Sequence, residues 1–123
     1  MTNVLLIEDH ALLRQYLPSL LSAEDQIFVV GTAESGYAGL TLARQLCFDV
    51  VLVDISLPDL SGLEVIKRLR QQYPERTIIA WSLYDEGDYG EYARASGAST
   101  YVCKTAPLAT LVTLLQNVPA IPC

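Results

Sequence analysis

Five short apolar runs divide the chain at nearly even intervals, and this spacing restricts the possible fold more than any other feature of the sequence. Each run is continuous rather than alternating and rich in β-branched side chains, a pattern typical of strands buried on both faces of a parallel sheet. The runs occupy residues 4–7, 27–30, 50–53, 77–81 and 100–103. Each interval therefore has room for one strand, one helix and two loops.

Apolar side chains at spacings of three and four residues fill the intervals and predict amphipathic helices. The clearest stripes lie in residues 12–21, 37–47, 63–73 and 108–115. Residues 85–92 form the weakest helical candidate, because two glycines there each cost about 1 kcal/mol relative to alanine. This alternation predicts a doubly wound α/β fold, with one five-stranded parallel sheet in the flavodoxin-like order 2-1-3-4-5.

Length and composition are those of one globular domain. The chain has 123 residues, of which 51% are hydrophobic and 18% charged, which is enough to bury a core and argues against disorder. We expect the domain to occupy residues 1–118, with residues 119–123 forming the start of a linker or tail. The formal net charge of -6 repels phosphate backbones, so direct binding to nucleic acid is not expected.

The sequence also predicts a cytoplasmic protein. No apolar run is long enough to span a bilayer, and the first residues lack the pattern of a signal peptide, so neither membrane insertion nor export is expected. The three cysteines, Cys47, Cys103 and Cys123, are widely spaced and form no Cys-x-x-Cys pair. We expect them to be free thiols in a reducing compartment, with neither a disulfide nor a zinc site.

Polar side chains follow the predicted strands at the points where the strands end. Glu8 and Asp9 follow the first strand, Asp54 the third, Ser82 the fourth and Lys104 the fifth. In open α/β sheets, ligands bind outside the carboxyl ends of the strands, where the strand order reverses. We therefore expect these five side chains to meet at one edge of the sheet.

Each of these residue types has a chemical use at such an edge. Three carboxylates about 4 Å apart repel one another by roughly 4 kcal/mol per pair at an effective dielectric near 20. Mg2+ relieves this repulsion and suits a site of carboxylates, waters and a phosphate. Asp54 can then attack phosphorus as a nucleophile, with Lys104 and Ser82 contacting the phosphoryl oxygens. Singly, each residue also fits a turn, a helix cap or a solvated strand end, and only the set favours a site.

In this order and spacing, the residues resemble the receiver domains of two-component response regulators over essentially the whole chain. The match rests on the acidic pair after the first strand, Asp54 in the sequence Asp-Ile-Ser-Leu-Pro-Asp-Leu-Ser-Gly, and the hydroxyl and lysine after the last two strands. The resemblance implies that Asp54 accepts a phosphoryl group, assisted by Ser82 and Lys104. It also implies that Mg2+ is held by Asp9, Asp54 and the backbone carbonyl of Ser56, with Glu8 acting through water.

The resemblance further implies a switch and a set of partners. Ser82 and Tyr101 occupy the positions of the family's switch hydroxyl and switch aromatic, so phosphorylation should alter the surface formed by the fourth helix, fifth strand and fifth helix. The phosphoryl donor would be a sensor histidine kinase or a phosphotransfer protein. The domain would assist its own phosphorylation and dephosphorylation rather than act as an enzyme on a separate substrate.

His10 and the pair Leu13-Arg14 resemble receivers that carry a LuxR-type DNA-binding output domain. A DNA-binding output domain missing from this chain, and a second copy in a homodimer, are therefore further candidate partners. Two positions depart from the family pattern. Leu83 stands where a small residue is usual and could narrow access to the acceptor. Thr105 stands where proline is common, which leaves the geometry of the preceding peptide bond open.

Three other functions are consistent with parts of the pattern. A haloacid-dehalogenase-like phosphatase would need a second aspartate at the position of Ser56. A flavodoxin-like module would need hydroxyl or glycine donors after the first strand, where Glu8 and Asp9 would repel the FMN phosphate. The third is a receiver-like protein-interaction module that does not need phosphorylation, and Leu83 keeps this alternative open.

Overall fold

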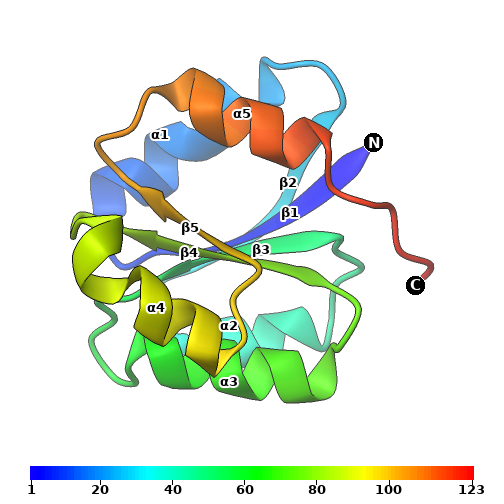
Figure 1. Ribbon diagram of the computed structural model, residues 1–123. Helices are drawn as coiled ribbons and strands as arrows, with labels where there is room; N and C mark the ends of the chain where they lie inside the picture. Colours follow the sequence, from blue (N-terminus) through cyan, green and yellow to red (C-terminus); the bar gives the residue numbers. More distant parts are fainter.

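The five apolar runs form the strands of one parallel sheet in the order β2-β1-β3-β4-β5 (Figure 1). The computed structural model describes residues 1–123. The predicted fold class and strand order are confirmed. The strands are β1 (Thr2–Ile7), β2 (Ile27–Ala33), β3 (Val50–Asp54), β4 (Thr77–Ser82) and β5 (Thr100–Cys103).

Five helices alternate with the strands and cover both faces of the sheet, with α1 and α5 on one face and α2, α3 and α4 on the other (Figure 1). They are α1 (Ala11–Ser22), α2 (Gly36–Ala43), α3 (Gly62–Gln72), α4 (Glu86–Ser96) and α5 (Leu108–Gln116). The central strand β3 is buried on both faces, because Val51 and Val53 pack toward α2, α3 and α4 while Val50 and Leu52 pack toward α1 and α5. This burial explains why its sequence is continuously apolar rather than alternating.

The helix that the sequence supported least, α4, is regular over eleven residues. The Asp85 side chain accepts a hydrogen bond from the N–H of Gly87 and so caps the first turn. Glu86 and Asp88 lie in that turn, and Arg94 lies in the last one, which matches the helix dipole at both ends. Capping and charge therefore offset the low propensity of the two glycines.

Gly62 sets the position of the loop that follows β3. Its N–H donates a hydrogen bond of 2.9 Å to the carbonyl of Ile55, so the first turn of α3 lies directly against the end of the strand. A β-carbon at residue 62 would overlap the carbonyl oxygen of Asp54. Only glycine permits this approach, and the approach holds the backbone of Asp54 at the edge of the sheet.

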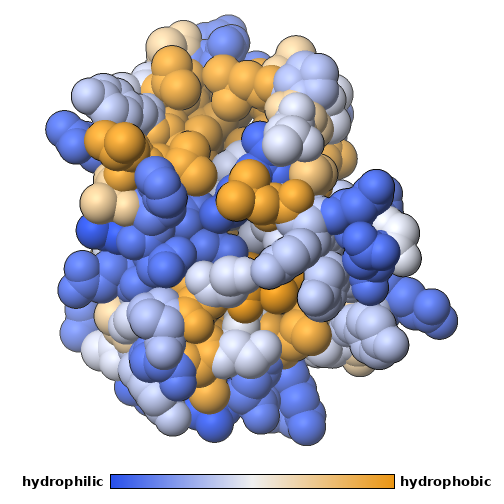
Figure 2. Space-filling view, turned by 90° about the vertical axis from the view of Figure 1, so that its left-hand side faces the viewer, coloured by the Kyte–Doolittle hydropathy of each residue, from blue (hydrophilic) through white to orange (hydrophobic).

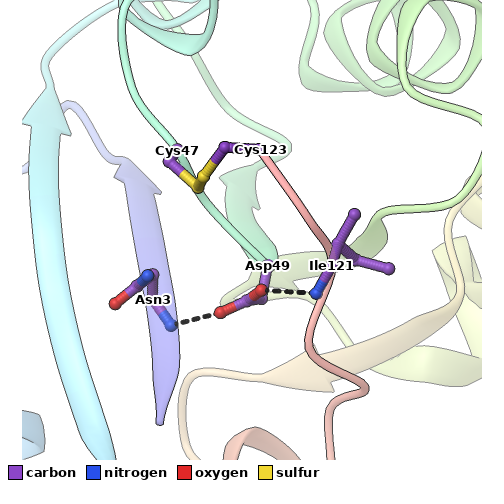
Figure 3. Close-up of a disulfide and its surroundings, with 5 residues drawn as sticks. All are labelled: Asn3, Cys47, Asp49, Ile121 and Cys123. Atoms are coloured by element: carbon purple, nitrogen blue, oxygen red, sulfur yellow. Dashed lines mark hydrogen bonds between the residues drawn. A yellow bond between two sulfur atoms is a disulfide. The ribbon is translucent and has the colours of Figure 1, made fainter.

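The expectation of three free thiols is wrong for two of the cysteines. Cys47 and Cys123 form a disulfide with their Cα atoms 5.5 Å apart, and Cys103 is free. The bonded pair joins the loop before β3 to the end of the chain (Figure 3). The sequence separation of 76 between the cysteines concealed this proximity, because only the folded topology brings the two segments together.

A buried carboxylate holds the same two segments together. Asp49 accepts hydrogen bonds from the N–H of Asn3 at 2.8 Å and from the N–H of Ile121 at 2.9 Å (Figure 3). The residues after α5 therefore lie against the amino-terminal ends of β1 and β3.

No helix has the length and apolar character that crossing a membrane requires.

We expect reduction of the Cys47–Cys123 bond to lower the melting temperature. A cross-link of this span restricts the unfolded chain and contributes up to about 4.5 kcal/mol in the chain-entropy treatment. Melts with and without a dithiol reductant measure the effect. Cys123→Ser should melt at the temperature of the reduced protein in both conditions, whereas Cys103→Ser should behave as the wild type. Three titratable thiols in the folded protein after mild oxidation would contradict the cross-link.

Candidate functional site

The sequence-predicted polar residues lie together at the carboxyl ends of the strands. Asp54 and Ser82 are the last residues of β3 and β4, and Glu8 and Lys104 directly follow β1 and β5. Figure 2 views the molecule from this edge, where hydrophilic side chains gather across the middle of the face. A cleft of about 270 Å3 opens there, and its lining includes Asp9, Asp54, Ser56 and Lys104.

Three carboxylates form the centre of the site. Oxygen atoms of Glu8, Asp9 and Asp54 all lie within 4.8 Å of one another. Glu8 is fully buried and Asp54 is 3% exposed, whereas Asp9 lies at the surface. Carboxylate oxygens are the ligands that Mg2+ and Ca2+ prefer. The donor set therefore fits a hard divalent cation that is reached from the side of Asp9.

Lys104 is the only cation in direct contact with the two buried carboxylates. Its Nζ lies 2.6 Å from Oε1 of Glu8 and 3.1 Å from Oδ2 of Asp54, and its side chain is 7% exposed. With every group ionised, three carboxylates against one ammonium leave two negative charges in excess. A divalent cation balances this excess, which is a second reason why the residues fit a metal.

The pKa values of the two buried carboxyl groups move in opposite directions. Burial raises the pKa of Asp54 to about 7, and hydrogen bonding with Glu8 and its charge act in the same direction. Burial also acts to raise the pKa of Glu8, but hydrogen bonds with Asp54, Lys104 and His10 outweigh it and hold that pKa below its ordinary value. Without metal, Glu8 is therefore ionised at neutral pH while Asp54 is partly protonated.

Ser56 contributes through its backbone. Its N–H donates a hydrogen bond of 2.9 Å to Oδ1 of Asp54, which orients the carboxylate and opposes the rise in its pKa. Its predicted role as a carbonyl ligand remains a prediction. The Lys104–Thr105 bond is trans, as are all peptide bonds of the chain. Leu83 is 70% exposed and lines the cleft, so it lies at the rim of the site.

The two predicted switch residues hold the same backbone segment. The Ser82 hydroxyl, which is 1% exposed, accepts a hydrogen bond of 3.1 Å from the N–H of Tyr84. The Tyr101 hydroxyl donates a bond of 2.7 Å to the carbonyl of Tyr84, and burial raises the pKa of this phenol. Both hydroxyls are thus hydrogen-bonded to the backbone of Tyr84, in the loop between β4 and α4.

Sequence reasoning also missed two residues that contact the acidic pair. The guanidinium of Arg14 donates bonds of 3.0 Å to the carbonyls of Glu8 and Asp9 and so fixes the turn after β1. The indole of Trp81 donates a bond of 2.9 Å to Oε1 of Glu8. The signal for the second was a tryptophan beside a polar strand end, because a buried indole N–H usually finds an acceptor.

Comparison with known proteins supports the same interpretation. Residues 4–116 match the model of the family described as response regulator receiver domain. The response regulator GacA of Pseudomonas viridiflava is 35% identical over 118 residues, which cover 96% of this chain and 55% of GacA. The chain therefore spans about half the length of GacA and of the other curated relatives compared with it.

Solved structures show the same likeness. A two-component response regulator of the LuxR family from Aurantimonas sp. has a TM-score of 0.87 and 26% identity over 98% of this chain and 89% of its own. The response regulator protein TrrA from Thermotoga maritima, solved in complex with Mg2+ and BeF, has a TM-score of 0.83 and 26% identity. That similarity covers 94% of this chain and 97% of TrrA.

In metal-free buffer, we expect the wild type to lose stability relative to Asp54→Asn as the pH rises. Folding raises the pKa of Asp54 from 3.8 to about 7, so its protonated form favours the folded state below pH 4. That contribution is lost as the pH rises from about 4 through 7. At about 1.4 kcal/mol per pKa unit, the loss is at most about 4 kcal/mol.

Melting temperatures in EDTA between pH 5 and pH 8 measure this difference, and millimolar Mg2+ should reverse it. The cation binds the folded carboxylate cluster and not the unfolded chain, so it should stabilise the wild type more than the variant. Parallel pH profiles for the two proteins would disprove the raised pKa of Asp54. An unchanged wild-type melting temperature in Mg2+ would disprove the metal site.

Proposed function

The chain belongs to the family of response regulator receiver domains, and we propose that it is a signalling switch controlled by phosphorylation of Asp54. As a receiver domain it is a phosphoacceptor module rather than an enzyme that acts on a separate substrate. The observation that carries the proposal is the position of Asp54, whose buried carboxylate contacts Lys104 and lies within 4.8 Å of two further acids in a cleft open to solvent.

The proposed reaction moves a phosphoryl group from a histidine of a partner to Asp54. A carboxylate oxygen of Asp54 forms the new O–P bond while the N–P bond to the histidine breaks, and the imidazole leaves with the electron pair. The transferring group carries negative charge on its peripheral oxygens. Lys104 starts 3.1 Å from the Asp54 carboxylate and moves to one of these oxygens as the carboxylate charge is consumed.

The residues proposed to hold Mg2+ are Asp9, Asp54 and the backbone carbonyl of Ser56, with Glu8 acting through water. A bound cation would neutralise charge between the carboxylates and the incoming phosphoryl oxygens. Asp9 is the exposed member of the acidic cluster and therefore offers the open side of the site. Asp54 must be ionised to attack, and neutralisation of the excess negative charge lowers the cost of that ionisation.

We propose that Ser82 and Tyr101 relay the change to the surface of α4, β5 and α5. A phosphoryl group on Asp54 adds acceptors that compete for the Ser82 hydroxyl, which now accepts from Tyr84. When Ser82 turns toward the phosphoryl oxygens, Tyr84 loses one of its two hydroxyl contacts, and the loop that begins α4 shifts. Such a shift alters partner binding only to the extent that the partner prefers one of the two states.

The proposed donor is a sensor histidine kinase or a phosphotransfer protein. The relatives are about twice as long as this chain, which supports a DNA-binding output domain as the part that responds to phosphorylation. A second copy of this chain, in a homodimer, is the other candidate partner. The net charge of -6 disfavours direct contact with nucleic acid. We propose a cytoplasmic location.

A specific observation also supports the alternative of an interaction module that does not need phosphorylation. Leu83 is an exposed apolar side chain at the rim of the cleft, where it offers an apolar contact to a partner. Phosphorylation of the purified protein separates the two functions.

We expect Asp54→Asn to abolish the Mg2+-dependent gain of one phosphoryl group from acetyl phosphate, because the amide is not a nucleophile. Intact mass and acid lability measure the product. Asp59→Asn is the matched control, since Asp59 lies in the same loop but is exposed and accepts bonds from the N–H groups of Gly36 and Tyr37. Full incorporation by Asp54→Asn would defeat the assignment, and no incorporation by the wild type would favour the interaction module.

We expect a phosphoryl mimic to change hydrogen exchange in residues 83–108, because the proposed relay runs through Tyr84 into α4 and through Tyr101 into β5. Exchange mass spectrometry with and without beryllofluoride and Mg2+ gives the comparison. The Ser82→Ala variant, which lacks the relay hydroxyl, should show a smaller change at the same mimic occupancy. Identical exchange of residues 83–108 in both conditions, with binding at Asp54 established, would disprove the relay.

A further inference from the structure

The only tryptophan of the chain lies beneath the candidate site and takes no part in the chemistry proposed above. Trp81 is the penultimate residue of β4, and its side chain lies on the α1 and α5 side of the sheet, in the apolar cluster that includes Leu17 and Leu111. It is 5% exposed. An indole has two rotatable angles and a large contact area, so burial in this cluster restricts its orientation.

Trp81 contacts both members of the buried ion pair. Its Nε1 donates a hydrogen bond of 2.9 Å to Oε1 of Glu8, and the Nζ of Lys104 lies 5.9 Å from its ring centroid, within the range of a cation–π contact. Glu8 Oε1 also accepts from Lys104, while Oε2 accepts from the N–H of His10 at 3.1 Å. Both oxygens of Glu8 are therefore bound, and the indole is one of the donors.

We infer that Trp81 is a positioning residue that fixes the carboxylate of Glu8 for the divalent cation. The inference rests on the proposed function, because it concerns the acidic cluster that would hold Mg2+. Lys104 cannot fix Glu8 alone, since the proposed transfer requires its ammonium to move toward the phosphoryl oxygens. The indole donor does not move in that step, so it keeps Glu8 in place while Lys104 changes partner.

One part of the Trp81 side chain packs in the apolar cluster, and another part borders a pocket. Its ring forms part of the wall of an apolar pocket of about 350 Å3 between α1 and α5, which also includes Leu83 and Val102. This pocket lies in the hydrophobic area above the hydrophilic middle of the face in Figure 2. Replacement by phenylalanine would keep an aromatic ring in this wall and remove the N–H, so Trp81→Phe isolates the donor from the packing.

The first test is Mg2+ affinity, measured by calorimetric titration of the purified chain. We expect Trp81→Phe to weaken Mg2+ binding by about tenfold, the lower end of what loss of an outer hydrogen bond around a metal site costs. At saturating Mg2+, its rate of phosphorylation by acetyl phosphate should return close to that of the wild type. A residue with a purely structural role would lower the melting temperature and leave Mg2+ affinity unchanged.

The matched control is Val102→Ala, which removes volume next to Trp81 in the register of β4 and β5 but keeps the indole donor. We expect this control to lose thermal stability and to retain Mg2+ affinity. Equal Mg2+ affinity of Trp81→Phe and the wild type would overturn the inference, as would an equal loss in Val102→Ala. Absence of Mg2+ binding by the wild type would instead contradict the proposed function itself.

A second measurement decides the matter if Trp81→Phe fails to fold. The chain has one tryptophan, so its indole N–H gives a single nitrogen–proton NMR signal in the wild type. We expect this proton to exchange slowly with water and its signal to move on addition of Mg2+. An indole proton that exchanges as fast as that of free tryptophan, or a signal unaffected by saturating Mg2+, would overturn the inference.

Discussion

Mutual repulsion among three carboxylates at a buried edge is the constraint on which the rest of the structure depends. Glu8, Asp9 and Asp54 lie within 4.8 Å of one another, and two of them are buried. At an effective dielectric near 20, each such pair costs roughly 4 kcal/mol. The metal-free fold offsets this cost with the ammonium of Lys104, with donors from Trp81 and Ser56, and with a proton on Asp54.

The order of the strands determines which residues supply these offsets. β1 and β3 are neighbours in the sheet, so the two buried acids lie side by side, whereas Lys104 follows β5, two strands beyond β3. Its ammonium reaches back to Glu8 and Asp54 and lies 5.9 Å from the ring centroid of Trp81. The ion pairs of Lys104 with Glu8 and Asp54 therefore connect the ends of β1, β3 and β5. Trp81 of β4 lies beside these charged groups.

The sequence predicted the elements that depend on local pattern and missed those that depend on side-chain direction across the fold. Continuous apolar runs and strand-end polar residues were sufficient for the sheet order and for bringing Glu8, Asp54 and Lys104 together. The Cys47–Cys123 bond was missed because its partners are far apart in the chain and share no motif. The Trp81–Glu8 hydrogen bond was missed because Trp81 was treated only as an apolar core residue. It does lie in the core, but its indole N–H also needs an acceptor there.

Both ends of the chain lie at the amino-terminal ends of the strands. Asp49 binds a backbone N–H near each end of the chain, so both ends lie at the amino-terminal side of the strands while the carboxylate cluster opens on the other (Figure 1). A tag, a surface anchor or a fused protein attached at either end would lie on the side of the domain away from Asp54. Protein immobilised in this way would present its cleft to solution, which suits the domain to optical or surface-based detection of the molecules that dock there.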